Sequence, residues 1–105
     1  MRSYEVDAIF DLSNHALGDS TARVGPLSGL RVVEICSTIA GPACARLLGD
    51  FGAEVTKIEP LTGDGMRQMG GHVGDVSLYA ATLLRNKRSV AVDLRTEAGR
   101  EIALA

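Results

Sequence analysis

The sequence predicts an α/β fold built around a short parallel sheet. A strand-like apolar run, a helix-like segment and a second strand-like run follow one another within about 30 residues, and a third run lies further along. This order forms a βαβ unit, whose two strands are parallel and whose crossover is right-handed in nearly all known cases. With 105 residues, the chain makes one domain at most.

The chain is expected to begin with an extension. Residues 1–28 show no sustained hydrophobic periodicity, and the stretch GPLSG at 25–29 is typical of a break. The folded part is therefore predicted to cover residues 29–105. Its last helix has no stop signal before Ala105, so the folded part is expected to be truncated at its carboxyl end.

A strand and an amphipathic helix open the folded part. The β-branched run at 30–36 is typical of a strand covered on both faces. Apolar residues then recur at i, i+3, i+4 and i+7, which predicts a helix with one buried stripe. The stripe consists of Cys44, Leu47, Leu48 and Phe51. Pro42 suits the first turn of this helix, and Gly52 suits the left-handed residue just past its end.

Two more strands and two short helices complete the predicted order. The second strand, at 54–59, stops before Pro60, which has no N–H to donate to the ladder. The glycine-rich stretch 61–75 is predicted to be a loop. The last three elements are a helix from Ser77 to Leu84, a strand at 89–94 and a helix capped by Thr96.

Composition excludes several classes of function. The net charge is −2 and the pI is near 5.6, whereas binding to nucleic acid or to an anionic membrane needs a basic surface. No apolar run approaches the ~20 residues of a membrane-spanning helix, and acidic residues interrupt the stretch where a signal peptide would be apolar. We expect a cytoplasmic protein that binds neither nucleic acid nor membrane.

Neither a metal site nor a disulfide framework is indicated. Cys36 and Cys44 stand in apolar surroundings without CxxC spacing or a histidine cluster, so both are expected to be reduced, buried thiols. His15 and His72 have no nucleophile or metal-ligand spacing beside them. They are expected to be structural or exposed.

The turn after the first strand is a candidate binding site. Its sequence, STIAGP, has one glycine where a dinucleotide-binding turn needs three, so a nicotinamide or flavin cofactor is disfavoured. Glu59 either occupies the position of a ribose partner or is a solvated strand end. Because a helix amino terminus offers N–H groups to an anion, Thr38, Ile39 and Ala40 either line a nucleotide or pantetheine path or are ordinary turn residues.

Five segments, in this order and spacing, resemble the start of the class III CoA-transferases. They are LSGLRVVE from Leu27, AGPACA from Ala40, LGDFGAEVTKIEP from Leu48, GDGMR from Gly63 and NKRSVAVDLR from Asn86. Each segment alone is a weak signal, but five in the right order make a chance similarity improbable. The resemblance covers residues 27–105.

This resemblance implies a Rossmann-like part that binds coenzyme A (CoA), in a full-length protein that forms an interlocked homodimer. The implied activity is transfer of CoA between an acyl-CoA thioester and a carboxylic acid, with CoA and acyl-CoA as substrates and no permanently bound cofactor. Two alternatives stay open. The family includes α-methylacyl-CoA racemases, which use proton-transfer groups instead of a nucleophile, and the chain could also be a non-catalytic nucleotide-binding fragment.

The family's catalytic aspartate, which attacks the thioester and gives covalent intermediates, lies downstream of this chain. The aspartates in the resembling part occupy other positions, so none inherits the role. They are Asp50, Asp64, Asp75 and Asp93. The chain alone is therefore expected to be inactive.

Carried over by position, the family pattern places CoA contacts at three points of the chain. The implied contact residues are Ile39, Ala40, Pro60, Val92, Asp93, Leu94 and Arg95. Pro60 departs from several transferases, which have arginine there, so a phosphate or adenine contact from that side chain is missing.

Basic residues around the third strand are candidates to replace this contact. Arg85, Lys87, Arg88 and Arg95 could neutralise the phosphates of CoA through charge-assisted contacts, or form a solvated surface cluster. The segment from Gly63 to Arg67 is likewise either a mobile substrate loop or a flexible connection.

Overall fold

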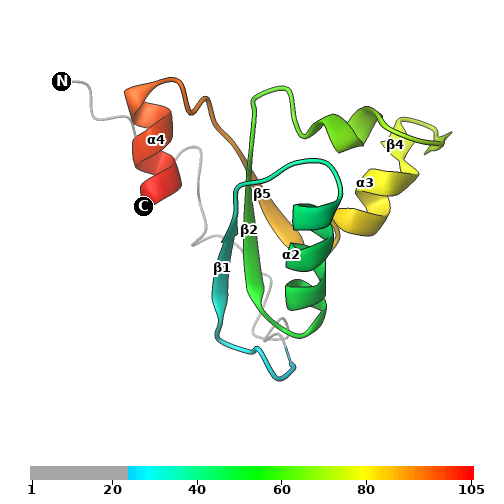
Figure 1. The fold of residues 1–105 in the computed structure, drawn as a ribbon, viewed down its shortest axis with the longest axis horizontal. Coiled ribbons are helices and arrows are strands. Elements are labelled where there is room, and N and C mark those ends of the chain that lie inside the picture. Colours follow the sequence, from blue (N-terminus) through cyan, green and yellow to red (C-terminus); the bar gives the residue numbers. More distant parts are fainter. Residues whose placement is uncertain (1–23) are drawn as a thin grey trace.

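A computed structural model describes residues 24–105 of the chain. Its main sheet has three parallel strands in the order β1-β2-β5 (Figure 1). These strands are β1 (Arg31–Glu34), β2 (Glu54–Glu59) and β5 (Lys87–Ala91). The predicted α/β fold with a parallel sheet is thus confirmed, and β2 has the predicted bounds.

Most of the predicted extension lies outside the described residues. The division at residue 28 therefore stays a prediction. Within the described part, Leu27 packs against the first core cluster, and its N–H donates to the carbonyl of Phe51 at 3.0 Å. The residues just before the predicted boundary thus contact the folded unit.

Helices lie on both faces of the sheet. The helix α2 (Ala40–Asp50) packs Ala45 against Val55 of β2. The helix α4 (Glu97–Leu104) packs Ile102 against the cluster that contains Ile58 of β2. Because side chains alternate along a strand, Val55 and Ile58 point to opposite faces. The helix α3 (Leu78–Leu83) lies beside α2.

The predicted loop at 61–75 contains regular structure. It includes the 3₁₀ turn η2 (Gly65–Gln68) and the strand β3 (His72–Val73), which forms a hairpin with β4 (Val76–Ser77) just after the predicted loop. Ser77 fastens this region, because its hydroxyl donates to the carbonyls of Met66 and Met69 at 3.0 and 2.7 Å. Two-residue strands and a single 3₁₀ turn are too short for a periodic pattern, so hydrophobic periodicity does not predict them.

The first strand is covered less completely than expected. Val33 and Ile35 are each 60% exposed, because α2 covers only the other face of β1 within residues 24–105. The expectation of a strand buried on both faces was therefore wrong for this part of the chain.

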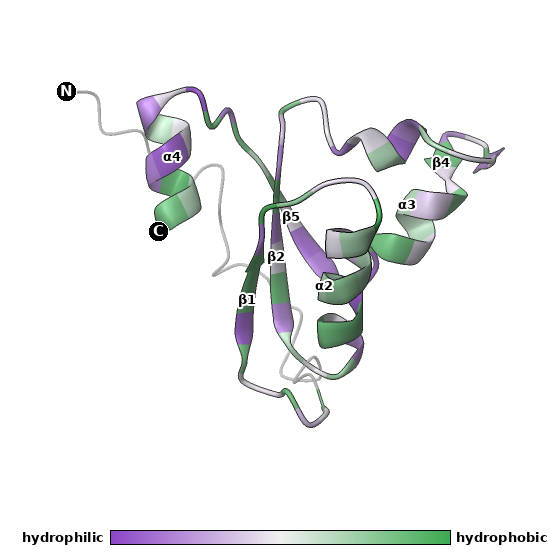
Figure 2. Cartoon of the chain, viewed as in Figure 1, coloured by the Kyte–Doolittle hydropathy of each residue, from purple (hydrophilic) through white to green (hydrophobic). Residues whose placement is uncertain are grey.

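The third strand begins and ends earlier than the predicted 89–94. Figure 2 shows hydrophilic residues at its start, and the side chain of Lys87 is nevertheless buried there. The strand stops because Asp93 forms a turn, in which its carboxylate accepts the N–H of Arg95 and its carbonyl accepts the N–H of Thr96, both at 3.0 Å.

The predicted helix boundaries are confirmed by their caps. The hydroxyls of Ser77 and Thr96 accept the N–H groups of Ala80 and Gly99. Gly52 ends α2 with a left-handed φ of 103°.

The two thiols are free but exposed, so the expectation of burial was wrong for Cys36 and Cys44.

Gly99 allows α4 to begin directly against the turn at Asp93. A Cβ atom at Gly99 would stand 2.0 Å from the carbonyl oxygen of Asp93 and 2.9 Å from the hydroxyl of Thr96. Since the first of these atoms belongs to the backbone, a larger residue forces the turn to move.

We therefore predict that Gly99→Ala lowers the free energy of unfolding by roughly 1–3 kcal/mol, the usual cost of overpacking. The matched control is Gly65→Ala, because a Cβ atom there meets nothing within 4 Å. Urea denaturation followed by circular dichroism measures both. Equal stability of the two variants would contradict this role for Gly99.

Candidate functional site

A crevice of about 560 Å³ opens at the carboxyl ends of the three parallel strands. Ligands of open α/β sheets bind at this edge of the sheet. The lining residues are Ile35, Cys36 and Ser37 after β1, Ile58, Glu59, Pro60, Leu61 and Thr62 around the end of β2, and Val92, Asp93, Leu94 and Arg95 after β5. We take this crevice as the candidate functional site.

The crevice unites most of the residues that the resemblance implied as CoA contacts. Pro60 and the segment 92–95 line it, although they lie more than 30 residues apart in the sequence. Ile39 and Ala40 are not among its lining residues and stand instead at the amino terminus of α2. The structure therefore separates the seven positions into two groups.

The amino terminus of α2 faces a carboxylate. The N–H of Thr38 points to Oδ1 of Asp64 at 3.5 Å. The backbone of Thr38 also has a left-handed φ of 70°, a conformation that residues other than glycine rarely adopt. Ile39, the N-cap residue, makes no side-chain cap. This turn thus already holds an anionic group of the protein itself.

Arg95 is the basic residue of the predicted set that reaches the crevice. Its side chain is 90% exposed, and its Nε and Nη2 each lie 2.8 Å from a carboxylate oxygen of Asp93. Hydrogen bonds from the side chain and backbone of Arg95 lower the pKa of Asp93 to about 2. Asp93 therefore orients the guanidinium, and Nη1, which makes no hydrogen bond within residues 24–105, can donate to a ligand.

The other three basic residues are used elsewhere or lie outside the crevice. Arg85 pairs with Asp50 at 2.8 Å, and Lys87 is buried in an ion pair with Glu34 at 2.7 Å. Arg88 is exposed on β5 and does not line the crevice.

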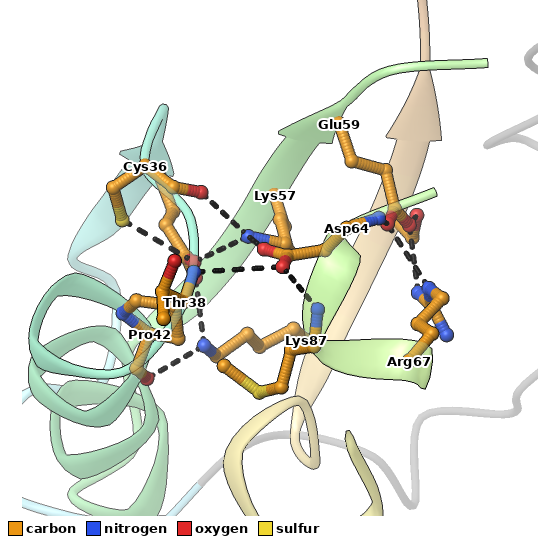
Figure 3. Close-up of polar contacts among 11 residues, drawn as sticks. Cys36, Thr38, Pro42, Lys57, Glu59, Asp64, Arg67 and Lys87 are labelled. Atoms are coloured by element: carbon orange, nitrogen blue, oxygen red, sulfur yellow. Dashed lines mark hydrogen bonds and ion pairs between the residues drawn. The ribbon is translucent and has the colours of Figure 1, made fainter. Parts of the chain in front are cut away.

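A buried network of four charged side chains (Figure 3) is hydrogen-bonded to Cys36, one of the residues that line the crevice. Lys57 Nζ lies 2.8 Å from Glu34 and 2.7 Å from Asp64, and Lys87 Nζ lies 2.7 Å from the other oxygen of Glu34. All four side chains are 2% exposed or less. This network was not predicted from the sequence.

The network fixes backbone atoms around the crevice. Lys57 Nζ donates to the carbonyl of Cys36 at 2.8 Å, and Lys87 Nζ donates to the carbonyl of Pro42 at 2.7 Å. Burial favours the neutral carboxyl of Glu34, but hydrogen bonds and Coulombic attraction from both lysines prevail and lower its pKa. The charged state is therefore the stable one.

Cys36 lies between the network and the crevice. Although Cys36 as a whole is exposed, its thiol is partly desolvated and donates to Glu34 at 3.4 Å, and this desolvation together with the carboxylate raises the pKa of the thiol. A Cβ atom at Gly41 would stand 2.3 Å from the Cys36 sulfur. Glycine at this position therefore allows α2 to start close to the end of β1.

A second cluster surrounds Glu59 at the end of β2. Its carboxylate accepts Nε and Nη2 of Arg67 at 3.0 and 2.7 Å, the N–H of Asp64 at 2.6 Å and the hydroxyl of Ser89. Burial works to raise the pKa of Glu59, but these donors lower it to about 2. Glu59 is therefore an anchor for the loop after β2, which excludes the interpretation as a solvated strand end.

Stability should depend on pH through Glu59. A carboxyl group whose folded pKa is about 2, against an ordinary value of 4.5, contributes stability above pH 4.5 and loses it as the pH falls towards 2. We predict that protonation of Glu59 accounts for about 3 kcal/mol of the unfolding free energy that is lost as the pH falls from 4.5 towards 2. The unfolding free energy of Glu59→Gln should therefore depend less steeply on pH in this range.

Urea denaturation at a series of pH values between 2 and 7 measures this slope. Glu54→Gln is the matched control, because Glu54 is exposed at the other end of β2. The same flattening in both variants would show that the effect is not specific to Glu59.

Some classes of site find no support in residues 24–105. No group of three or more His, Cys, Asp or Glu side chains is placed there to hold a metal ion. The helices in this range are too short or too polar to cross a membrane. His72 is exposed, and His15 lies outside the described residues.

The family model described as CoA-transferase family III matches residues 27–105. The chain therefore belongs to this family, as the resemblance of its motifs predicted. The chain is 47% identical over 79 residues to succinyl-CoA–D-citramalate CoA-transferase of Chloroflexus aurantiacus, with 73% of the chain and 20% of that protein covered. It is 44% identical over 81 residues to (R)-2-hydroxy-4-methylpentanoate CoA-transferase of Clostridioides difficile, with 72% and 20% covered.

Solved structures agree with the assignment. A CaiB/BaiF family protein from Brucella suis matches with a TM-score of 0.68 and 41% sequence identity, over 74% of this chain and 22% of that one. The chain spans about a fifth of the length of the relatives that it matches.

Proposed function

We propose that this chain supplies the CoA-binding, Rossmann-like part of an enzyme that transfers CoA between an acyl-CoA thioester and a carboxylic acid. The observation that carries the proposal is the crevice, where Pro60 and the segment 92–95, implied as CoA contacts by the motifs, come together at the carboxyl ends of parallel strands. The relatives named above are CoA-transferases, which favours transfer over racemisation.

The chemistry of the crevice suits this ligand. Its apolar walls, such as Ile35, Ile58 and Val92, offer surface for the adenine or pantetheine portion of CoA, and Arg95 offers N–H donors to a phosphate. Homodimeric assembly and a cytoplasmic setting belong to the same proposal. They are supported by the family resemblance.

Arg95→Ala should raise the Kd for CoA severalfold, because it removes the charged donor group from the crevice. Arg31→Ala is the matched control, since Arg31 is exposed on β1 and does not line the crevice. Titration calorimetry with CoA measures both variants. An unchanged Kd for Arg95→Ala would exclude Arg95 from the site, and no CoA binding by the unaltered chain would overturn the proposed crevice.

The 105-residue chain should not catalyse transfer by itself. Asp50 and Asp93 pair with arginines, and Asp64 is 1% exposed and paired with Lys57. Asp75 is exposed but lies outside the crevice. Steady exchange of CoA between succinyl-CoA and a free acid, followed by chromatography, would contradict this expectation.

A further inference from the structure

A second cavity, of about 370 Å³, lies between the sheet and α3. Four cationic side chains line it, and no acidic residue is among its lining residues within the described part of the chain. The cations are Lys57, Arg67, Arg85 and Lys87. None of the residues that line this cavity also lines the crevice.

The carboxylates that neutralise these cations stand outside the cavity and orient them. Glu59 accepts Nε and Nη2 of Arg67, and Asp50 accepts Nη2 of Arg85. Neither acid lines the cavity. The two guanidinium groups are therefore held in place by acids that do not line the cavity, as in a preorganised anion site.

Both arginines keep donors for a ligand. Within residues 24–105, Nη1 of Arg67 and both Nε and Nη1 of Arg85 make no hydrogen bond. The side chains are 43% and 52% exposed, so these groups are accessible from solvent. A guanidinium fork matches the two oxygens of a carboxylate.

The remaining wall comes mainly from α3 and is apolar except for Ser89. Ala80, Ala81 and Leu84 line the cavity beside the arginines. An organic acid can place its hydrocarbon part against this wall and its carboxylate against the cations, whereas inorganic phosphate has no apolar part to bury. The volume lies within the usual range of small-molecule pockets, about 300–1,000 Å³.

From these observations we infer that the cavity beneath α3 is a binding site for a small organic carboxylate, with Arg67 and Arg85 as its donors. This site is separate from the crevice, so the inference stands whether or not the crevice binds CoA.

The test uses the 105-residue chain and succinate, observed through the NMR signal of the ligand, at an ionic strength kept constant with sodium chloride. Succinate should bind, and succinamide, its uncharged analogue, should not. Arg85→Ala should weaken the binding of succinate about tenfold, the loss typical of one charged hydrogen-bonding partner.

Ala81→Glu provides a second variant at an exposed position. It places a carboxylate in the cavity and should abolish succinate binding. Arg88→Ala is the matched control, because it removes an exposed arginine of β5 that does not line the cavity. Circular dichroism checks that each variant is folded.

Three results would overturn the inference. These are no binding of succinate to the unaltered chain, equal weakening by Arg85→Ala and Arg88→Ala, or binding of inorganic phosphate without binding of succinate. The second result would mean that succinate binding depends only on surface charge. The third would mean that the site recognises another anion.

Discussion

The rest of the structure depends on the burial of four charges between the sheet and α2. Lys57, Lys87, Glu34 and Asp64 are nearly inaccessible to solvent, and a single unpaired charge in such a place costs several kcal/mol. Two positive and two negative groups can be buried there only together. Since the four residues come from all three parallel strands and from the loop after β2, forming the network requires the whole sheet.

The network also explains where the crevice lies. Lys57 holds the carbonyl of Cys36 at the end of β1, and the neighbouring cluster around Glu59 holds the loop after β2. The turn at Asp93 holds the third side, supported by the close approach of Gly99 in α4. Charged groups thus fix each strand end, while the crevice itself retains apolar walls and one accessible guanidinium group.

The arginines near the sheet illustrate how pairing decides the use of a charge. Arg95 is bound to Asp93 and projects into the crevice, whereas Arg67 and Arg85 are bound to Glu59 and Asp50 and line a different cavity. In each pair the acid accepts some of the guanidinium N–H groups, and within residues 24–105 the others make no hydrogen bond. The acids therefore orient each guanidinium group and still allow it to bind a ligand.

The sequence by itself determined the order of the three parallel strands and of the helices α2, α3 and α4, the bounds of β2, the caps at Ser77 and Thr96, and the family. These features are recorded locally, in hydrophobic periods, capping residues, and the order and spacing of motifs. The tertiary structure alone decided the buried network and the assignment of each arginine. Lys57 meets Glu34 because the parallel register places them side by side, and Lys57 meets Asp64 because the loop folds back. A charge inside each of two apolar strand runs was the available signal, but the partner of a charge depends on register, which the local sequence does not specify.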